Sequence, residues 1–129
     1  MTVKLELYKC EICGNIVQIM HEGEGELICC GQVMSKLEPH FKEEEMNEKH
    51  VPVFIEDNKI QVGSTPHPMI KEHYIEFIQC MTSDKKYIQT KFLHPEQSPE
   101  MDLNNQEYNI AREYCNIHGL WVNNDLTIS

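Results

Sequence analysis

The chain has 129 residues, of which 40% are apolar and 25% are charged, and this composition excludes wholesale disorder. Its 21 acidic and 11 basic residues give a formal charge of −10, without the basic stripe that nucleic-acid binding requires. No apolar run approaches the ~20 residues that cross a bilayer, and residues 1–10 do not resemble a signal peptide. We therefore expect a cytoplasmic protein that binds neither membranes nor nucleic acid.

The cysteines and histidines divide the chain into two regions. Four of the six cysteines lie within residues 1–30, whereas most of the seven histidines come later. We predict a small metal-binding module over residues 1–36 and a larger domain over residues 37–129, joined by a solvated acidic connector at 38–47. Because the cytoplasm keeps thiols reduced, clustered cysteines indicate metal ligation or redox chemistry before disulfides.

The first region is predicted to consist of short β-strands. Residues 3–7 alternate apolar and charged side chains, residues 15–20 follow a turn at Gly14, and residues 27–28 lead to the second cysteine pair. A module of this length buries too little apolar surface to be stable alone. A bound metal would supply the missing free energy of folding.

Two cysteine pairs in this region are the candidate metal ligands. Cys10 and Cys13 form a Cys-x-x-Cys turn that directs two thiolates at one cation, and Cys29 and Cys30 supply a second pair. The alternatives are a disulfide between the adjacent cysteines and ordinary free thiols. Spacing alone leaves zinc and iron open, although the adjacent pair departs from the usual zinc ribbon and weakly favours iron.

The larger region is predicted to be an antiparallel β-sandwich. Short β-prone runs recur about every ten residues, and helical periodicity is convincing nowhere. The predicted strands are residues 51–55, 59–62, 74–78, 87–93, 108–114 and 120–122. Residues 95–105 form the longest predicted polar loop, and Cys80 is predicted to be a buried strand cysteine without a ligand role.

Further candidate ligands are spread over this second region. Cys115 and His118 have the Cys-x-x-His spacing that lets one turn present a thiolate and an imidazole to the same metal. His50, His67 and His73 are the other candidates, and His67 lies between two prolines that restrict its backbone. Each histidine alone also fits a surface or core role, and spacing does not establish that the five residues converge.

Three strings give the chain a specific resemblance to a known family. Glu-Lys-His-Val-Pro at 48–52, His67-Pro68 followed by His73, and Glu-Tyr-Cys-Asn-Ile-His-Gly-x-Trp at 113–121 resemble desulfoferrodoxin, the two-iron form of superoxide reductase. The likeness covers nearly the whole chain. It implies a desulforedoxin-like module, then an immunoglobulin-like antiparallel β-sandwich, usually within a homodimer.

The resemblance also implies two non-haem iron centres and their ligands. The Fe(Cys)4 centre takes Cys10, Cys13, Cys29 and Cys30. The catalytic Fe(His)4(Cys) centre takes His50, His67, His73 and His118 as equatorial ligands and Cys115 as the axial thiolate. Lys49 matches the lysine that draws in superoxide and assists protonation, and Glu48 matches the glutamate that closes the sixth position in the ferric state. Tyr74 and Phe77 stand where relatives often carry tryptophan.

The implied activity is the inner-sphere reduction of superoxide to hydrogen peroxide by ferrous iron, without release of dioxygen. An electron carrier such as rubredoxin would restore the ferrous state. One alternative is a non-catalytic iron electron-transfer protein, which has no need of a Glu48-Lys49 pair beside a ligand. Another is a zinc-stabilised binding module with incidental histidines, although five ligands exceed the four that structural zinc prefers.

Overall fold

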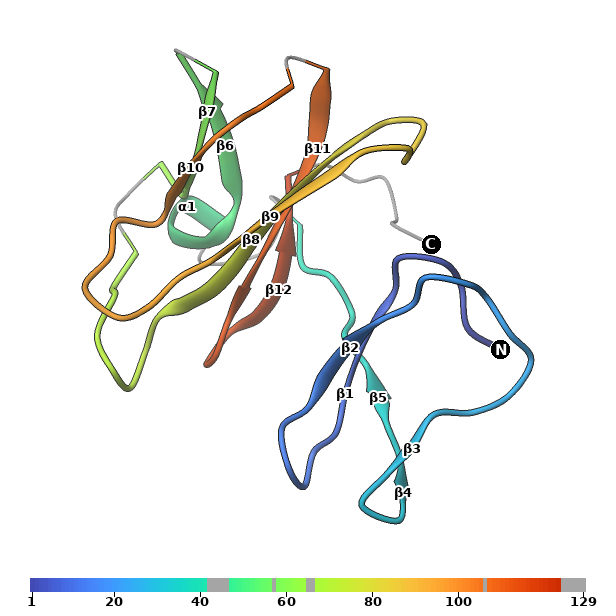
Figure 1. The fold of residues 1–129 in the computed structure, drawn as a ribbon. Coiled ribbons are helices and arrows are strands. Elements are labelled where there is room, and N and C mark those ends of the chain that lie inside the picture. The colour runs from blue at the N-terminus through green and yellow to red at the C-terminus, as the bar shows by residue number, and fades with distance from the viewer. Residues whose placement is uncertain (42–46, 57, 65–66, 106, 124–129) are drawn as a thin grey trace. The chain divides into compact units, whose positions relative to one another are not determined.

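The computed structural model describes residues 1–41, 47–56, 58–64, 67–105 and 107–123. Within them the chain forms two compact units, one spanning Met1–Glu38 and the other beginning at Pro39. Apart from the four-residue helix α1 (Asn47–His50), the regular elements of these ranges are strands paired in antiparallel sheets (Figure 1). The predicted fold class, a small module followed by an antiparallel β-sandwich, is confirmed. No helix in these ranges is long and apolar enough to cross a membrane.

The N-terminal unit is built from five very short strands. A three-stranded sheet has the order β2-β1-β5, and β3 and β4 form a separate hairpin. The strands are β1 (Leu7–Lys9), β2 (Ile16–Gln18), β3 (Ile28–Cys29), β4 (Gln32–Val33) and β5 (Ser35–Lys36). The strand predicted at residues 3–7 begins later, because Leu5 has a φ of 75° and this left-handed backbone cannot continue a strand.

A buried carboxylate, that of Glu6, ties this small unit together. Glu6 accepts hydrogen bonds from the Val3 amide (2.7 Å) and the Tyr8 hydroxyl (3.0 Å), and it pairs with Lys36 Nζ at 2.8 Å. Burial by itself raises the pKa of Glu6, but the bonds from Lys36, Val3 and Tyr8 outweigh it and hold that pKa below its ordinary value. The ionised carboxylate therefore links β1 to β5 across the sheet.

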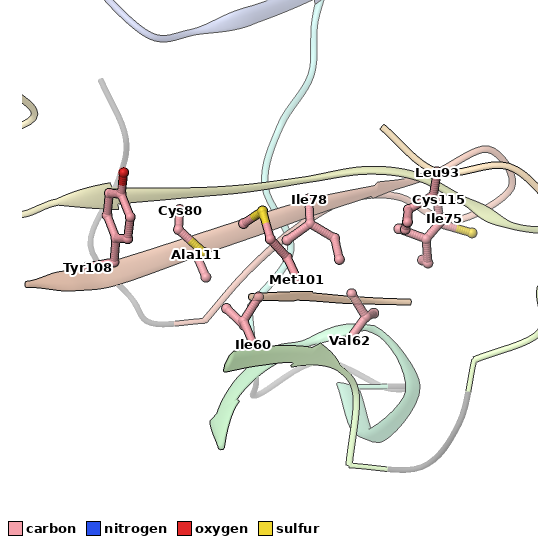
Figure 2. Packing of buried hydrophobic residues seen from close by; sticks show 10 residues of the cluster. All are labelled: Ile60, Val62, Ile75, Ile78, Cys80, Leu93, Met101, Tyr108, Ala111 and Cys115. Carbon is pink, nitrogen blue, oxygen red and sulfur yellow. The ribbon is translucent and has the colours of Figure 1, made fainter. Parts of the chain in front are cut away.

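The second unit is a sandwich of two antiparallel sheets. One sheet has the order β10-β7-β6 and the other has the order β12-β11-β8-β9. Their strands are β6 (Pro52–Ile55), β7 (Lys59–Val62), β8 (Ile75–Thr82), β9 (Ile88–Phe92), β10 (Glu100–Asp102), β11 (Tyr108–Cys115) and β12 (Gly119–Val122). Side chains from both sheets form one apolar core, which includes Ile60, Ile78, Met101 and Cys115 (Figure 2). Cys80 lies fully buried in this core and outside both groups of candidate ligands, as predicted.

Two elements of this unit correct the sequence-based prediction. Strand β10 lies inside the predicted loop at 95–105, where Met101 is only 2% exposed and pairs with Ile60 of β7. A single apolar residue between two acidic ones gives too short an alternation to be recognised. Helix α1 is one turn long and therefore has no periodicity to detect. Part of the predicted connector is also structured, because His40 bridges to Trp121 of β12, while residues 42–46 lie outside the described ranges.

Candidate metal centres

The four cysteines of the N-terminal unit converge on one point and form a four-cysteine cluster. Their sulfur atoms all lie within 4.8 Å of one another, with Sγ separations of 3.6 Å for Cys13–Cys29 and 4.0 Å for Cys29–Cys30. Four thiolates bound tetrahedrally at about 2.3 Å from a metal would be about 3.8 Å apart. The described geometry therefore fits a closed four-thiolate site.

The adjacent cysteines reach one metal because they lie in a tight hairpin. Cys29 pairs with Gln32 across β3 and β4, which leaves Cys30 and Gly31 as a two-residue loop. Both loop residues have positive φ, 53° for Cys30 and 76° for Gly31, as a type I′ turn requires. A left-handed conformation costs a non-glycine residue about 1–2 kcal/mol, so the Cys30 backbone carries strain that metal binding offsets.

Proton affinities differ sharply among these thiols. The Cys13 amide donates to Cys10 Sγ at 3.4 Å and, as the main cause, lowers the pKa of Cys10 to about 6. Hydrogen bonding with Cys13 and the other neighbouring thiols raises the pKa of Cys30 to about 12. The Cys10 thiol thus ionises readily near neutral pH, whereas Cys30 would release its proton when a cation binds.

The second group, the histidine–cysteine cluster, comprises four histidines and one cysteine from separate parts of the sandwich. His50 ends α1, His67 and His73 lie between β7 and β8, Cys115 ends β11, and His118 lies in the turn before β12. One ligand atom from each lies within 4.8 Å of all the others. The structure therefore brings together all five candidates, which spacing alone could not establish.

The four imidazoles form a closed ring of neighbours. His50 contacts His67 and His118, and His73 also contacts His67 and His118, with ring centroids 4.6–4.9 Å apart and interplanar angles of 64–80°. In a tetrahedron every pair of ligands is equally close, whereas in a square each ligand has two near neighbours. The four imidazoles therefore form a square-like ring, with Cys115 as a fifth potential donor.

Nitrogen positions support a cation within this ring. Nε2 of His67 lies 3.0 Å from Nε2 of His50, and two ligands at right angles with bonds of about 2.1 Å would be about 3.0 Å apart. Nδ1 of His67 lies 2.6 Å from the Pro68 carbonyl and donates to it, which leaves the Nε2 lone pair for a metal. Nε2 of His73 is buried without a hydrogen-bond partner among the described residues, and a metal would satisfy it.

Burial sets the protonation states in this cluster. It lowers the pKa of His67 to about 4 and lowers that of His73, so both imidazoles are neutral at pH 7, the form that binds metals. Burial also raises the pKa of Cys115, against the opposing effect of the His118 amide, which donates to Cys115 Sγ at 3.4 Å. A cation at the centre would counter that rise and stabilise the thiolate.

The donor set identifies the kind of metal that fits. His50, His67 and Cys115 are buried, while His73 and His118 are half-buried. Five donors exceed the closed tetrahedron of structural zinc, and they leave one position of an octahedral ion unfilled. Four imidazoles with one thiolate suit a redox-active non-haem iron.

Helix α1 carries the two other predicted site residues. Lys49 is exposed, and its positive charge contributes to lowering the pKa of His73, after burial and the charge of His118. Glu48 lies in the same turn, with its side chain outside the described part of the structure. Phe77 packs on Tyr114 with ring centroids 5.7 Å apart, and it is not one of the cluster residues.

Sequence reasoning missed Asn116, which holds the histidine–cysteine cluster together. Its Oδ1 accepts from the Tyr74 amide at 2.9 Å, and its Nδ2 donates to the Glu72 carbonyl at 3.0 Å. These bonds fasten the residues on either side of His73 to the turn that carries Cys115. Asn116 lies within the string at 113–121 that carries the family resemblance, but an asparagine in a short turn by itself signals only turn preference.

Glu113 is a second unanticipated feature. Its side chain is fully buried, both carboxyl oxygens have no hydrogen-bond partner among the described residues, and burial raises its pKa well above the ordinary value. It lies two residues before Cys115 on β11. A charged residue type within a strand that is otherwise mostly buried is the signal that could have drawn attention to it.

Fold and ligand sets define a β-protein with two non-haem metal centres, one closed by four thiolates and one built from four imidazoles and a thiolate. The sequence profile of desulfoferrodoxin matches residues 42–124, and that of the desulfoferrodoxin N-terminal domain matches residues 2–37. The chain belongs to the desulfoferrodoxin family. Its four-cysteine and histidine–cysteine clusters match the two iron centres of desulfoferrodoxin.

Individual relatives agree with this assignment. Desulfoferrodoxin from Desulfarculus baarsii is 46% identical over 125 residues, covering 94% of this chain and 97% of that protein. Desulforedoxin from Megalodesulfovibrio gigas is 52% identical over 31 residues, covering 24% of this chain and 84% of that protein. The superoxide reductase from Treponema pallidum has a similar structure, with a TM-score of 0.72 and 27% identity, covering 96% of this chain and all of that one.

Proposed function

We propose that this chain is a superoxide reductase that converts superoxide to hydrogen peroxide without producing dioxygen. The observation that carries the proposal is the ring of four imidazoles with Cys115 as a fifth donor. Membership of the desulfoferrodoxin family and the fold shared with the superoxide reductase of Treponema pallidum support it.

The reaction adds one electron and two protons to superoxide to give hydrogen peroxide. A ferrous ion held by the histidine–cysteine cluster supplies the electron. Lys49 attracts the anion, because its exposed ammonium group lies on α1 beside His50, in a chain whose formal charge is −10. The local field around an opening governs the approach of a small anion more than the net charge does.

The remaining site residues hold and adjust the reacting position. Cys115 would hold the metal through its thiolate and supply electron density to it, and the amide of His118 donates to its sulfur at 3.4 Å. Lys49 assists protonation of the product. Glu48, its neighbour on α1, would supply a carboxylate to the metal in the oxidised state.

The two regions of the chain have different functions. Residues 1–36 hold the Fe(Cys)4 centre, and residues 37–129 form the catalytic domain. The profile matches at 2–37 and 42–124 support this division, as do the two compact units. A rubredoxin-like carrier restores the ferrous state, and the protein acts in the cytoplasm without binding membranes or nucleic acid.

The functional form is a homodimer. Phe92 is 74% exposed and Ile88 is 38% exposed on β9, where they pair with the buried residues Phe77 and Met81 of β8. The apolar strip formed by Phe92 and Ile88 supports association with a second copy, because covering it would bury apolar area that now faces water.

The stoichiometry of superoxide consumption tests the proposal. Iron-reconstituted, prereduced protein in excess receives a known pulse of superoxide, and peroxide, dioxygen and oxidised iron are all measured. A reductase gives one peroxide and one oxidised centre per superoxide, with no dioxygen. Half that peroxide with matching dioxygen would indicate dismutation and would favour the alternative of a non-catalytic electron-transfer protein. Protein with zinc in the histidine–cysteine cluster is the control and should give the dismutation ratio.

A further inference from the structure

Trp121 touches the histidine–cysteine cluster without belonging to it. Its ring stacks on that of His50, with centroids 4.9 Å apart and an interplanar angle of 18°. Its Nε1–H donates to the carbonyl of His118 at 3.1 Å. One buried side chain, 2% exposed, thus contacts one metal ligand through its face and another through its edge.

His50 needs such support because its own element is weak. Helix α1 is four residues long, and an isolated helix of one turn is unstable in water. Trp121 instead lies on β12, which pairs with β11 over four residue pairs from Arg112–Val122 to Cys115–Gly119. The stack therefore connects a ligand on a weak element to the same sheet that positions Cys115.

The position of Trp121 is itself fixed by contacts with His40. His40 contacts the Trp121 ring with centroids 4.8 Å apart, and its backbone exchanges hydrogen bonds with Leu120 and Val122 on either side of Trp121. The His40 ring also lies 3.7 Å from where a Cβ on Gly119 would be. The indole thus contacts two imidazoles, and of these only His50 belongs to the histidine–cysteine cluster.

We propose that Trp121 is a positioning residue that sets the orientation of His50 and His118 before the metal binds. Its flat contact with His50 limits rotation of that imidazole, and its bond to the His118 carbonyl fixes the turn that carries Cys115 and His118. Partners that orient metal ligands in this way typically contribute about 10- to 100-fold to metal affinity. The inference rests on the histidine–cysteine cluster as a metal site and does not depend on superoxide as the substrate.

The test compares cobalt(II) binding by three variants and the wild type, with the four-cysteine site of each already filled with zinc. Trp121→Leu removes both contacts and should weaken cobalt binding about 10- to 100-fold and change the visible cobalt spectrum. Trp121→Phe keeps a ring against His50 but loses the bond to His118, so its affinity should lie between those of Trp121→Leu and the wild type. Leu120→Ala is the matched control, because Leu120 is buried on the same strand with its side chain on the opposite face. It should lower the thermal midpoint while leaving cobalt affinity and spectrum unchanged.

Fluorescence provides a readout that needs no substitution. Trp121 is the only tryptophan of the chain, so the tryptophan emission reports on the surroundings of this side chain alone. Zinc(II) added to protein whose four-cysteine site is already filled should change that emission in proportion to occupancy of the histidine–cysteine site.

The proposal is overturned if Trp121→Leu binds cobalt within about twofold of the wild type with the same spectrum, far from the loss expected for a ligand-orienting partner. It is equally overturned if Leu120→Ala weakens cobalt binding as much as Trp121→Leu does, or if zinc leaves the tryptophan emission unchanged. None of these outcomes bears on superoxide turnover, which the stoichiometry experiment tests separately.

Discussion

The two metal clusters of this chain are built in opposite ways. The four-cysteine cluster takes all its ligands from residues 10–30, on short turns within a small unit. The histidine–cysteine cluster gathers ligands from residues 50–118, carried by a helix, a loop, a strand end and a turn of a sandwich. In the first case we expect a bound metal to organise the chain locally, whereas in the second a folded core positions the ligands. The comparison suggests two routes to a metal site within one chain.

The largest expected effect is selective unfolding after loss of a metal. Cys13→Ser should unfold the N-terminal unit, because its short strands bury little without the cation, and should leave the sandwich folded. His118→Ala should instead lose its own metal while both units stay folded. Amide hydrogen exchange measured along the chain separates the two outcomes. Equal loss of protection in both units of either variant would contradict this difference.

Substitution of Glu6 probes the small unit without touching its metal ligands. Glu6→Gln should lower the free energy of unfolding of this unit by about 1–3 kcal/mol, because it removes the charge that faces Lys36 within a buried hydrogen-bond set. Loss of the visible absorbance of the iron-loaded four-cysteine centre in denaturant would follow the transition. Exposed Glu24 provides the control, since Glu24→Gln should have no effect.

The same carboxyl predicts a direction for the pH dependence. Its pKa is lower in the folded unit than the ordinary value of 4.5, so below that pH the unfolded chain binds more protons than the folded one. The stabilisation is complete above pH 4.5 and is lost as the pH falls through the folded pKa. The difference between wild type and Glu6→Gln should therefore be constant from about pH 5 to about pH 7 and narrow below pH 4.5. A difference that grew on acidification would contradict the assigned direction.

A smaller effect is expected for Asn116 in the sandwich. Asn116→Ala removes the two side-chain bonds that fasten the residues beside His73, and should weaken metal binding at the histidine–cysteine site about tenfold. Asn123 is a matched control, because it also makes two side-chain bonds to backbone, with the Ala111 amide and the Asn109 carbonyl. Asn123→Ala should reduce thermal stability and leave metal affinity unchanged. Equal losses of affinity in the two variants would assign Asn116 a general structural role.

The smallest effect concerns the approach of the substrate. Lys49→Ala should slow association of superoxide several-fold at low ionic strength, and the difference should shrink as salt screens the charge. Lys86→Ala removes an equally exposed lysine in the turn between β8 and β9 and should leave the rate unchanged. Pulse radiolysis at two ionic strengths gives the rates. A loss independent of salt would indicate that Lys49 acts only in proton transfer.

The two clusters also differ in how far the sequence alone predicts them. The four-cysteine site could be predicted from the residues alone, because Cys10-x-x-Cys13 and the adjacent pair lie close enough along the chain to share a metal. The histidine–cysteine site needed the family resemblance, because the distance between His50 and Cys115 along the chain says nothing about their separation in space. Strand β10 was missed because Met101 is its only apolar residue.

Residues that support the ligands escaped prediction for a related reason. Trp121 acts through the face and edge of its ring, and Asn116 through bonds to backbone atoms more than forty residues away. The contact of Trp121 with His50 and the bonds of Asn116 join residues more than forty positions apart, which a local pattern does not reveal. Adjacent Cys29 and Cys30 indicated an unusual geometry, but only the positive φ of Cys30 and Gly31 explains how both sulfurs reach one metal.

X-ray absorption at the iron edge tests the central difference between the clusters most directly. Protein with zinc in the four-cysteine site and iron in the histidine–cysteine site isolates the second centre. Four nitrogen neighbours at about 2.1 Å and one sulfur, in five- or six-fold coordination, are the predicted result. A four-coordinate tetrahedral iron, or an iron without a sulfur neighbour, would contradict the arrangement of four imidazoles around an ion with Cys115 as its fifth ligand.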